Sequence, residues 1–189
     1  MEISTRALVT QIHGMLFGVF FLLLIYGMLV ELYRSSFTSQ PSQLSARGLS
    51  LRRFYLVLTA IAGWVAVLTG AYIVYPWYRA IPPAGVVNLA LYPQALLKSS
   101  PTTAGWHSLG MEWKEHVAWF APMAMTMAAY VSTKYDSSIR KHPQVRNAVL
   151  VFVIVAFIAA GVAGYFGAEI DDHAPVRGGA IHQLMQEGR

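Results

Sequence analysis

Two of the six histidines lie within apolar stretches of the sequence, where ionisable side chains are rare. His13 stands in ALVTQIHGMLFGVF, and His116 stands in EHVAWFAPM. An ionisable residue in such a stretch is a functional candidate, because apolar surroundings penalise it. A neutral imidazole binds metals readily, and two imidazoles that face a common plane from two helices form the axial ligand pair of a haem iron. This pair therefore indicates chemistry at a metal-centred cofactor.

The residues near these histidines are of the kinds that a flat cofactor needs. Gly14 and Gly18 have GxxxG spacing, which leaves a strip that a porphyrin face or another helix can approach closely. Large side chains at helical spacing are candidates for an apolar ring pocket: Phe17, Phe20, Phe120 and Met123. Cations near the ends of the stretches are candidates to bind haem propionates: Arg6, Arg79 and Lys114. Ordinary helix packing explains the glycines and the aromatic residues equally well.

Four apolar stretches are long enough to position these residues on membrane-spanning helices. They cover about 7–30, 54–77, 113–131 and 148–167, and a helix of about 20 residues crosses the hydrocarbon core of a bilayer. None alternates with a period of two, as the strands of a membrane β-barrel do. Pro122 interrupts the third stretch, a defect that neighbouring helices can absorb. We therefore predict an all-α, integral-membrane four-helix bundle with one long outer loop over 78–112.

The composition favours the same class of protein. Of the 189 residues, 56% are apolar and only 12% are charged, against about 25% charged in soluble domains. The absence of cysteine excludes disulfides, iron–sulfur clusters and covalently attached c-type haem. The net charge is +5, but the basic residues form short clusters, which does not favour nucleic-acid binding. The bundle is expected to fill 1–175, and 176–189 form a polar C-terminal tail.

The basic residues predict the orientation of the chain. Eight of the fourteen lie in two short loops, over about 31–53 and 132–147: Arg34, Arg47, Arg52, Arg53, Lys134, Arg140, Lys141 and Arg146. Such loops stay in the cytoplasm, so both termini are expected outside, in a bacterial inner membrane. Spans one and three then cross in the same direction, and the two histidines lie near the outer leaflet at depths that match within about one helical turn. Matched depth favours one haem between these spans over two unrelated histidines that bridge helices or sit in the wet interface.

The stretch QIHGMLFGVFFLLLIYGML resembles the helices of b-type membrane cytochromes, especially the cytochrome b561-like class, and EHVAWFAPM is loosely similar. In that class, a histidine followed by small and aromatic residues carries haem. The resemblance implies haem ligation by His13 and His116. It covers about a quarter of the chain. Those cytochromes often hold two haems, but this chain has no second histidine pair within its spans, so the resemblance implies one haem.

Other polar residues leave alternatives open. Glu112 and His116 share a helix face, and with four neighbours they are candidates for a divalent metal site: Glu115, Asp171, Asp172 and His173. A solvated rim is the simpler explanation of these acids. Three methionines are reserve haem ligands: Met123, Met125 and Met127. His107, in the outer loop, is either an interfacial histidine or a participant in quinol proton transfer.

The sequence thus predicts a membrane electron-transfer subunit that binds one b-type haem near the outer face of the bilayer, within a larger respiratory-type complex. Its expected partners are other membrane subunits and a redox partner on the outer side, and quinone is a further candidate cofactor. Used this way, the chain would be a redox subunit and would have no catalytic residue of its own. The alternative is a non-catalytic structural subunit of a respiratory or photosynthetic complex. In a variant of that alternative, the histidines bind chlorophyll.

Overall fold

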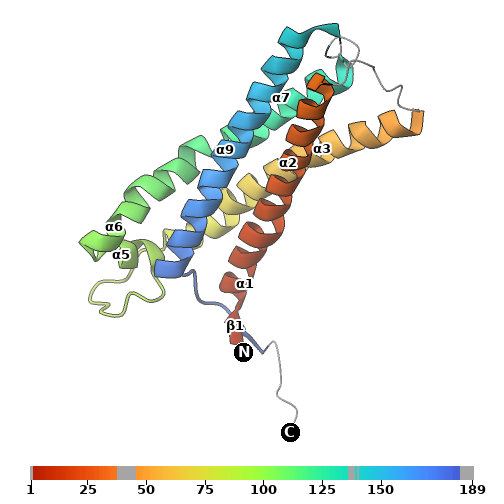
Figure 1. Ribbon diagram of the computed structural model, residues 1–189. Helices are drawn as coiled ribbons and strands as arrows, with labels where there is room; N and C mark the ends of the chain where they lie inside the picture. Colours follow the sequence, from red (N-terminus) through yellow and green to blue (C-terminus); the bar gives the residue numbers. More distant parts are fainter. Residues whose placement is uncertain (1, 38–45, 136–138, 140, 184–189) are drawn as a thin grey trace.

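The computed structural model describes residues 2–37, 46–135, 139 and 141–183. Arg140, the side chain of Arg34 and the tail beyond residue 183 lie outside the described part. The chain is mostly helical, as predicted (Figure 1). The sequence analysis did not predict the small antiparallel sheet, in which β1 (Glu2–Ser4) pairs with β2 (Ile181–Gln183).

The helices follow one another in four long stretches. The first comprises α1 (Thr5–Gln11), the π-helical η1 (Ile12–Gly18) and α2 (Val19–Phe37). The second comprises α3 (Ala46–Thr69), η2 (Gly70–Val74) and α4 (Tyr75–Tyr78). Two short helices follow within the long outer loop, α5 (Pro93–Lys98) and α6 (Pro101–Gly105). The third stretch continues from α6 through η3 (Trp106–Met111), η4 (Trp113–Val117) and α7 (Phe120–Lys134), and the fourth is α9 (Pro143–His173).

Three helices in the described part are long and apolar enough to cross a membrane. They are Thr5–Tyr33, Arg47–Tyr78 and Pro143–His173, and they contain the predicted spans 7–30, 54–77 and 148–167. The third predicted span, 113–131, is divided instead, because the helix breaks at Ala118 and Trp119 before α7 begins. Pro122 has no N–H to donate to the Ala118 carbonyl, and the Ala121 N–H bonds to that carbonyl at 3.2 Å in a tighter turn.

One apolar core joins α2, α3, α7 and α9. Ile25, Met125 and Val153 are fully buried in it. Small residues allow the helices to approach closely: a Cβ built on Gly63 would lie 2.7 Å from the Phe21 ring, so only glycine lets α3 rest on that ring. In a bilayer, such van der Waals contact does much of the work of holding helices together, because lipid tails are as apolar as leucine.

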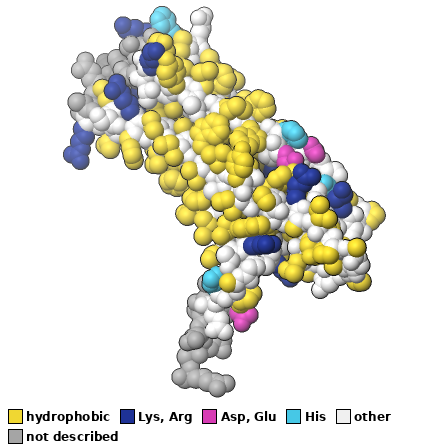
Figure 2. All heavy atoms as spheres, turned by 180° about the vertical axis from the view of Figure 1, so that it is seen from behind, with side chains coloured by type: hydrophobic (Ala, Val, Ile, Leu, Met, Phe, Trp, Pro, Cys, Tyr) yellow, Lys and Arg dark blue, Asp and Glu magenta, His cyan; other side chains and the backbone are white. Residues whose placement is uncertain are grey.

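The two ends of the helical body differ in character (Figure 1). The terminal end, as we call it, carries both chain termini, α5 and α6, and has a second small core that includes Tyr78, Leu97 and Ile170. The basic end is the opposite one, where α2 leads to α3 and α7 leads to α9. Figure 2 shows apolar side chains over the middle of the molecule, with basic side chains gathered at one end and a mixture of acidic, basic and histidine side chains towards the other. This division matches the two-loop clustering of basic residues in the sequence.

The orientation of the chain can be tested by thiol labelling, because the sequence contains no cysteine. We expect an impermeant thiol reagent to label a Val87→Cys variant in intact cells, since Val87 is 94% exposed at the terminal end. A variant with Arg47→Cys, exposed at the basic end, should react only after permeabilisation, because loops rich in basic residues stay in the cytoplasm. Labelling at position 47 but not at position 87 in intact cells would contradict this orientation and would place the basic end outside.

Candidate functional site

His13 lies on η1 with its ring against the junction of α3 and η2. Its Nδ1 atom is 3.0 Å from the Thr69 hydroxyl oxygen. A Cβ built on Gly70 would lie 2.8 Å from the imidazole Cε1 atom, so a glycine at this position makes room for the ring. The second helical stretch therefore fixes the place of the histidine through a hydrogen bond and a close approach.

The hydrogen bonds around Thr69 also define which nitrogen of His13 carries the proton. The Thr69 hydroxyl donates to the Val65 carbonyl at 2.7 Å, as helical threonines commonly do. With its proton used there, the hydroxyl oxygen accepts the bond from the histidine, so the His13 Nδ1 atom is the donor. The Nε2 atom then keeps its lone pair. Metal-binding histidines likewise have one ring nitrogen fixed by a hydrogen bond and a lone pair on the other. In this structure the Nε2 atom lies close to Gly70, 3.1 Å from where a Cβ on that residue would stand.

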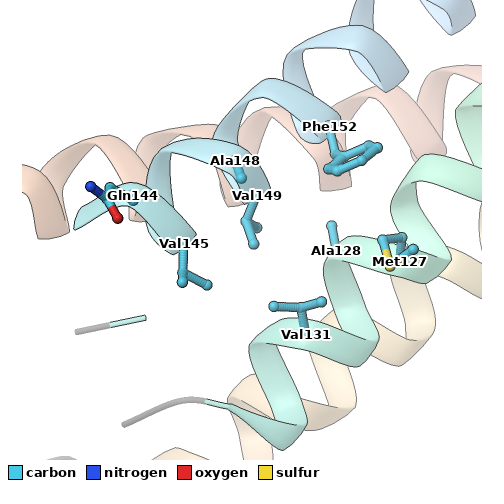
Figure 3. Close-up of a pocket in the computed structure, with 8 residues that line it drawn as sticks. All are labelled: Met127, Ala128, Val131, Gln144, Val145, Ala148, Val149 and Phe152. Atoms are coloured by element: carbon cyan, nitrogen blue, oxygen red, sulfur yellow. The ribbon is translucent and has the colours of Figure 1, made fainter. Parts of the chain in front are cut away.

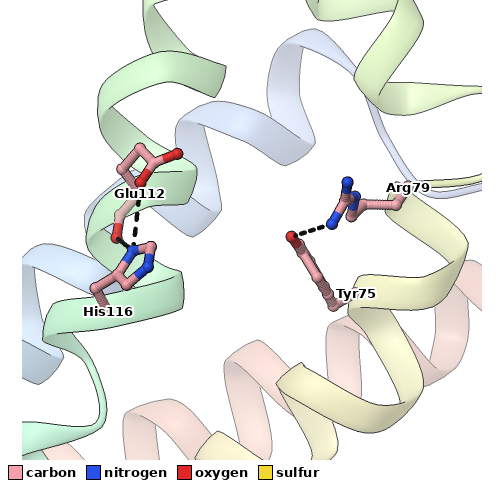
Figure 4. Close-up of polar contacts among 4 residues, drawn as sticks. All are labelled: Tyr75, Arg79, Glu112 and His116. Carbon is pink, nitrogen blue, oxygen red and sulfur yellow. Dashed lines mark hydrogen bonds and ion pairs between the residues drawn. The ribbon is translucent and has the colours of Figure 1, made fainter.

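His116 has the same tautomer in a different setting. Its side chain is exposed on η4, and its Nδ1 atom is 3.1 Å from the Glu112 carbonyl oxygen and 3.3 Å from the Glu112 carboxylate (Figure 4). Both of these oxygens are acceptors, so Nδ1 is again the donor and Nε2 is the nitrogen with a lone pair. The two histidines thus share the chemistry of a ligand.

The structure places Lys114, and not His116, on the interior side of η4. A Cβ built on Gly167 of α9 would lie 2.8 Å from the Lys114 ammonium nitrogen. The same ammonium group interacts electrostatically with His13 and with Asp171. Residues two apart on a helix point to nearly opposite sides, so an inward Lys114 turns His116 outward. In the described part of the chain, no hydrogen bond or ring contact joins His116 to His13.

The other predicted site residues lie around this group without closing a pocket. Gly14 is exposed, and a Cβ there would meet nothing, while a Cβ on Gly18 would meet only the backbone of its own helix. Phe17 is half-buried. Three of the expected ring-pocket residues are exposed: Phe20, Phe120 and Met123. Gly70 and Gly167 instead receive the His13 and Lys114 side chains from other helices, and neither glycine was predicted from the sequence as a site residue.

The predicted cations contact aromatic rings at the terminal end. The guanidinium of Arg6 lies 5.6 Å from the centre of the Trp77 ring. Arg79 lies over the Tyr75 ring and donates to the Tyr75 hydroxyl at 3.2 Å (Figure 4). As for the alternative metal site, the described residues include no group of three or more histidines and carboxylates close enough to hold a metal ion.

A second polar group joins α4 to η3 and α5. The hydroxyl of the buried Tyr78 lies 2.7 Å from Nδ1 of His107, whose Nε2 is 3.5 Å from the Gln94 amide nitrogen. Burial lowers the pKa of His107, and the charge of Lys98 lowers it further, while Glu115 and Glu112 act in the opposite direction. The neutral imidazole therefore fastens the outer loop to the end of the second helical stretch.

Comparison of the chain with family models, with curated proteins and with solved structures found no match.

The lowered pKa of His107 predicts a loss of stability in acid. The unfolded chain takes up a proton near pH 6.5, whereas the folded chain resists it, so the contribution is present above pH 6.5 and is lost as the pH falls below it. We expect thermal unfolding in detergent between pH 7.5 and 5 to show a smaller acid loss for His107→Gln than for the unaltered protein. His142→Gln, exposed at the basic end, is the control and should behave like the unaltered protein. Equal losses in the two variants would contradict this role.

Proposed function

We propose that this chain is an integral-membrane electron-transfer subunit that holds one b-type haem near the terminal end of its helices. The observation that carries the proposal is the hydrogen bonding of His13. Thr69 holds the Nδ1 proton and leaves the Nε2 lone pair for a metal, on a helix apolar enough to cross a bilayer. A haem in this place would supply one-electron redox chemistry, and the chain would supply its ligands, its orientation and its electrostatic surroundings.

The residues present fit such a group in their chemistry. His13 is the first proposed axial ligand and His116, with the same tautomer, is the second. Because His116 is exposed and turned outward on η4, it would have to turn inward for both histidines to hold one haem. Lys114 and Arg6 are the proposed partners of the propionates, since both carry positive charge at the terminal end. Gly14, Gly18 and Phe17 lie on η1 beside His13, where the first turns of the helix are open to a flat ring.

We further propose that all four helical stretches cross a bacterial inner membrane, with both termini on the outer side. The third crossing combines η4 and α7, and its break at Pro122 is covered by the neighbouring helices α3 and α9. The first and last described segments, β1 and β2, pair at the same end of the molecule, as an even number of crossings requires (Figure 1).

A haem in this position needs partners. A single group near one side of a hydrocarbon core about 30 Å thick cannot pass electrons across it alone. We therefore propose that other membrane subunits and an outer-side redox partner complete a respiratory-type complex, with quinone as a candidate electron carrier in the bilayer. Surfaces that suit subunit contact are present: Gly161 and Gly164 of α9 leave open space, and Ile81 and Val87 of the outer loop are highly exposed apolar residues.

A non-catalytic structural subunit is the second candidate, and one contact favours it. The His13–Thr69 hydrogen bond is also what a histidine makes when it only joins two helices. The visible spectrum of the purified protein separates the candidates. Sharp reduced α and β bands indicate haem, far-red bands indicate chlorophyll, and a spectrum without visible bands supports the structural subunit.

Ligation by the two histidines can be tested by single substitutions. We expect His13→Ala or His116→Ala to abolish haem retention or to convert a low-spin spectrum to a high-spin one, because one axial ligand is lost. His142→Ala and His182→Ala should leave the spectrum unchanged. A low-spin spectrum like that of the unaltered protein in His116→Ala would contradict the pairing, and Met123, Met125 and Met127 would then be the next ligands to replace.

The supporting role of Thr69 gives a second test. Thr69→Val keeps the side-chain shape and removes the oxygen that accepts from His13, so we expect haem affinity to fall by about 10–100-fold, while Thr69→Ser retains it. Thr10→Val is a matched control, because Thr10 also donates to a carbonyl of its own helix but bonds to no histidine. Haem titration of the purified variants measures the change. If Thr69→Val and Thr10→Val bind haem with equal affinity, the Thr69 hydroxyl does not support the haem ligand.

A further inference from the structure

An apolar groove opens between α7 and α9 near the basic end (Figure 3). Its volume is about 360 Å³, which lies within the range of small-ligand pockets, about 300–1,000 Å³. The side chains of Ala128 and Val131 face it from α7, and those of Ala148 and Val149 face it from α9. Gln144 is the one polar residue on its wall. The groove therefore suits a hydrocarbon chain.

The start of α9 forms one end of this groove. Gln144 and Val145, which line it, belong to the first turn of a helix of 31 residues. No side chain caps this turn, since the preceding residue, His142, makes no capping hydrogen bond. Pro143 has no N–H, and the N–H groups of Val145 and Arg146 bond to the His142 carbonyl at 3.1 and 3.2 Å. What this turn offers an anion is therefore the partial positive charge of the helix start.

Arg146, in the same turn, makes no ion pair with any residue that the structure describes. It is half-buried, and its Nε atom is buried with no hydrogen-bond partner in the described structure. Its position on α9 is that of the buried Val149 and Val153, three and seven residues later, so it lies on the face turned towards the bundle. A buried guanidinium nitrogen that lacks a partner is costly, and an anionic ligand would supply one.

The surroundings favour an anion as well. Lys141 is exposed just before α9 begins. Glu31, the one acidic residue described at this end, is already bonded to Arg52 at 2.9 Å. Among the described residues at this end, a negatively charged group therefore meets exposed positive charge, and the described carboxylate is already paired.

We propose that this groove is a binding site for an anionic phospholipid. The phosphate binds at the start of α9, against Arg146 and Lys141, and one acyl chain lies along the apolar wall between α7 and α9. A molecule with an anionic head and an apolar tail satisfies both halves of the site at once, whereas a zwitterionic phospholipid adds a cation where the protein already has several. This site is independent of any haem, since it lies at the opposite end of the helices.

The test uses the full chain purified in detergent, with phosphatidylglycerol or phosphatidylcholine added in equal amounts. Native mass spectrometry counts the bound lipids, and the thermal unfolding midpoint reports their effect. We expect phosphatidylglycerol to be retained about tenfold more than phosphatidylcholine and to raise the midpoint. Arg146→Gln should abolish this preference. Ala148→Trp, a change at an exposed position that fills the groove, should reduce retention of both lipids.

Arg53→Gln is the matched control, because it removes an exposed charge at the same end but away from the groove wall. It should keep the preference for phosphatidylglycerol. Equal retention of the two lipids by the unaltered protein would overturn the proposal, as would unchanged retention in Ala148→Trp, a variant that tests the groove even if Arg146→Gln does not fold. Equal loss of preference in Arg53→Gln and Arg146→Gln would show general charge attraction and would also overturn it.

Discussion

Close approach between helices is the constraint on which the rest of the structure depends. Helices in a bilayer gain little from hiding apolar surface, so they are held by contact at short range, and small residues permit that contact. Gly63 admits the Phe21 ring, Gly70 admits the His13 imidazole, and Gly167 admits the Lys114 ammonium group. Glycines on a facing helix thus allow both close packing in the core and the placement of ionisable side chains near the terminal end.

Three histidines and one lysine near the terminal end lie where the helices are wound more loosely. His13, His107, Lys114 and His116 all belong to π-helical segments, whereas the core towards the basic end is built from ordinary α-helix. Such wide turns are uncommon and are frequent at functional sites, because they shift the direction in which later side chains point. The terminal end therefore combines irregular backbone with polar residues, and the basic end combines regular backbone with an open apolar groove.

Much of this architecture could be predicted from the sequence. What could not be predicted is the rotation of each helix about its own axis, which decides which side chains face the interior. Apolar length predicted three of the long helices, whereas the third span, 113–131, was expected whole despite Pro122 and is divided. Depth along a helix also follows from counting residues. The direction in which a side chain faces does not follow from counting residues. His116 was expected on the interior side of its helix, and Lys114 lies there instead. The role of Thr69 could not be predicted, because a threonine in an apolar stretch is unremarkable until the residue that it faces on the next helix is known.

The pairing of β1 with β2 has a consequence for how the molecule is made. Thr5 bonds through its backbone to Ala180 and through its hydroxyl to His182, so contacts are made across more than 170 residues of chain. Closing a loop of this length carries the largest entropy cost of any contact described, and it cannot occur before α9 has left the ribosome and taken its place. β1 therefore pairs with β2 only after all the helices between them have been made.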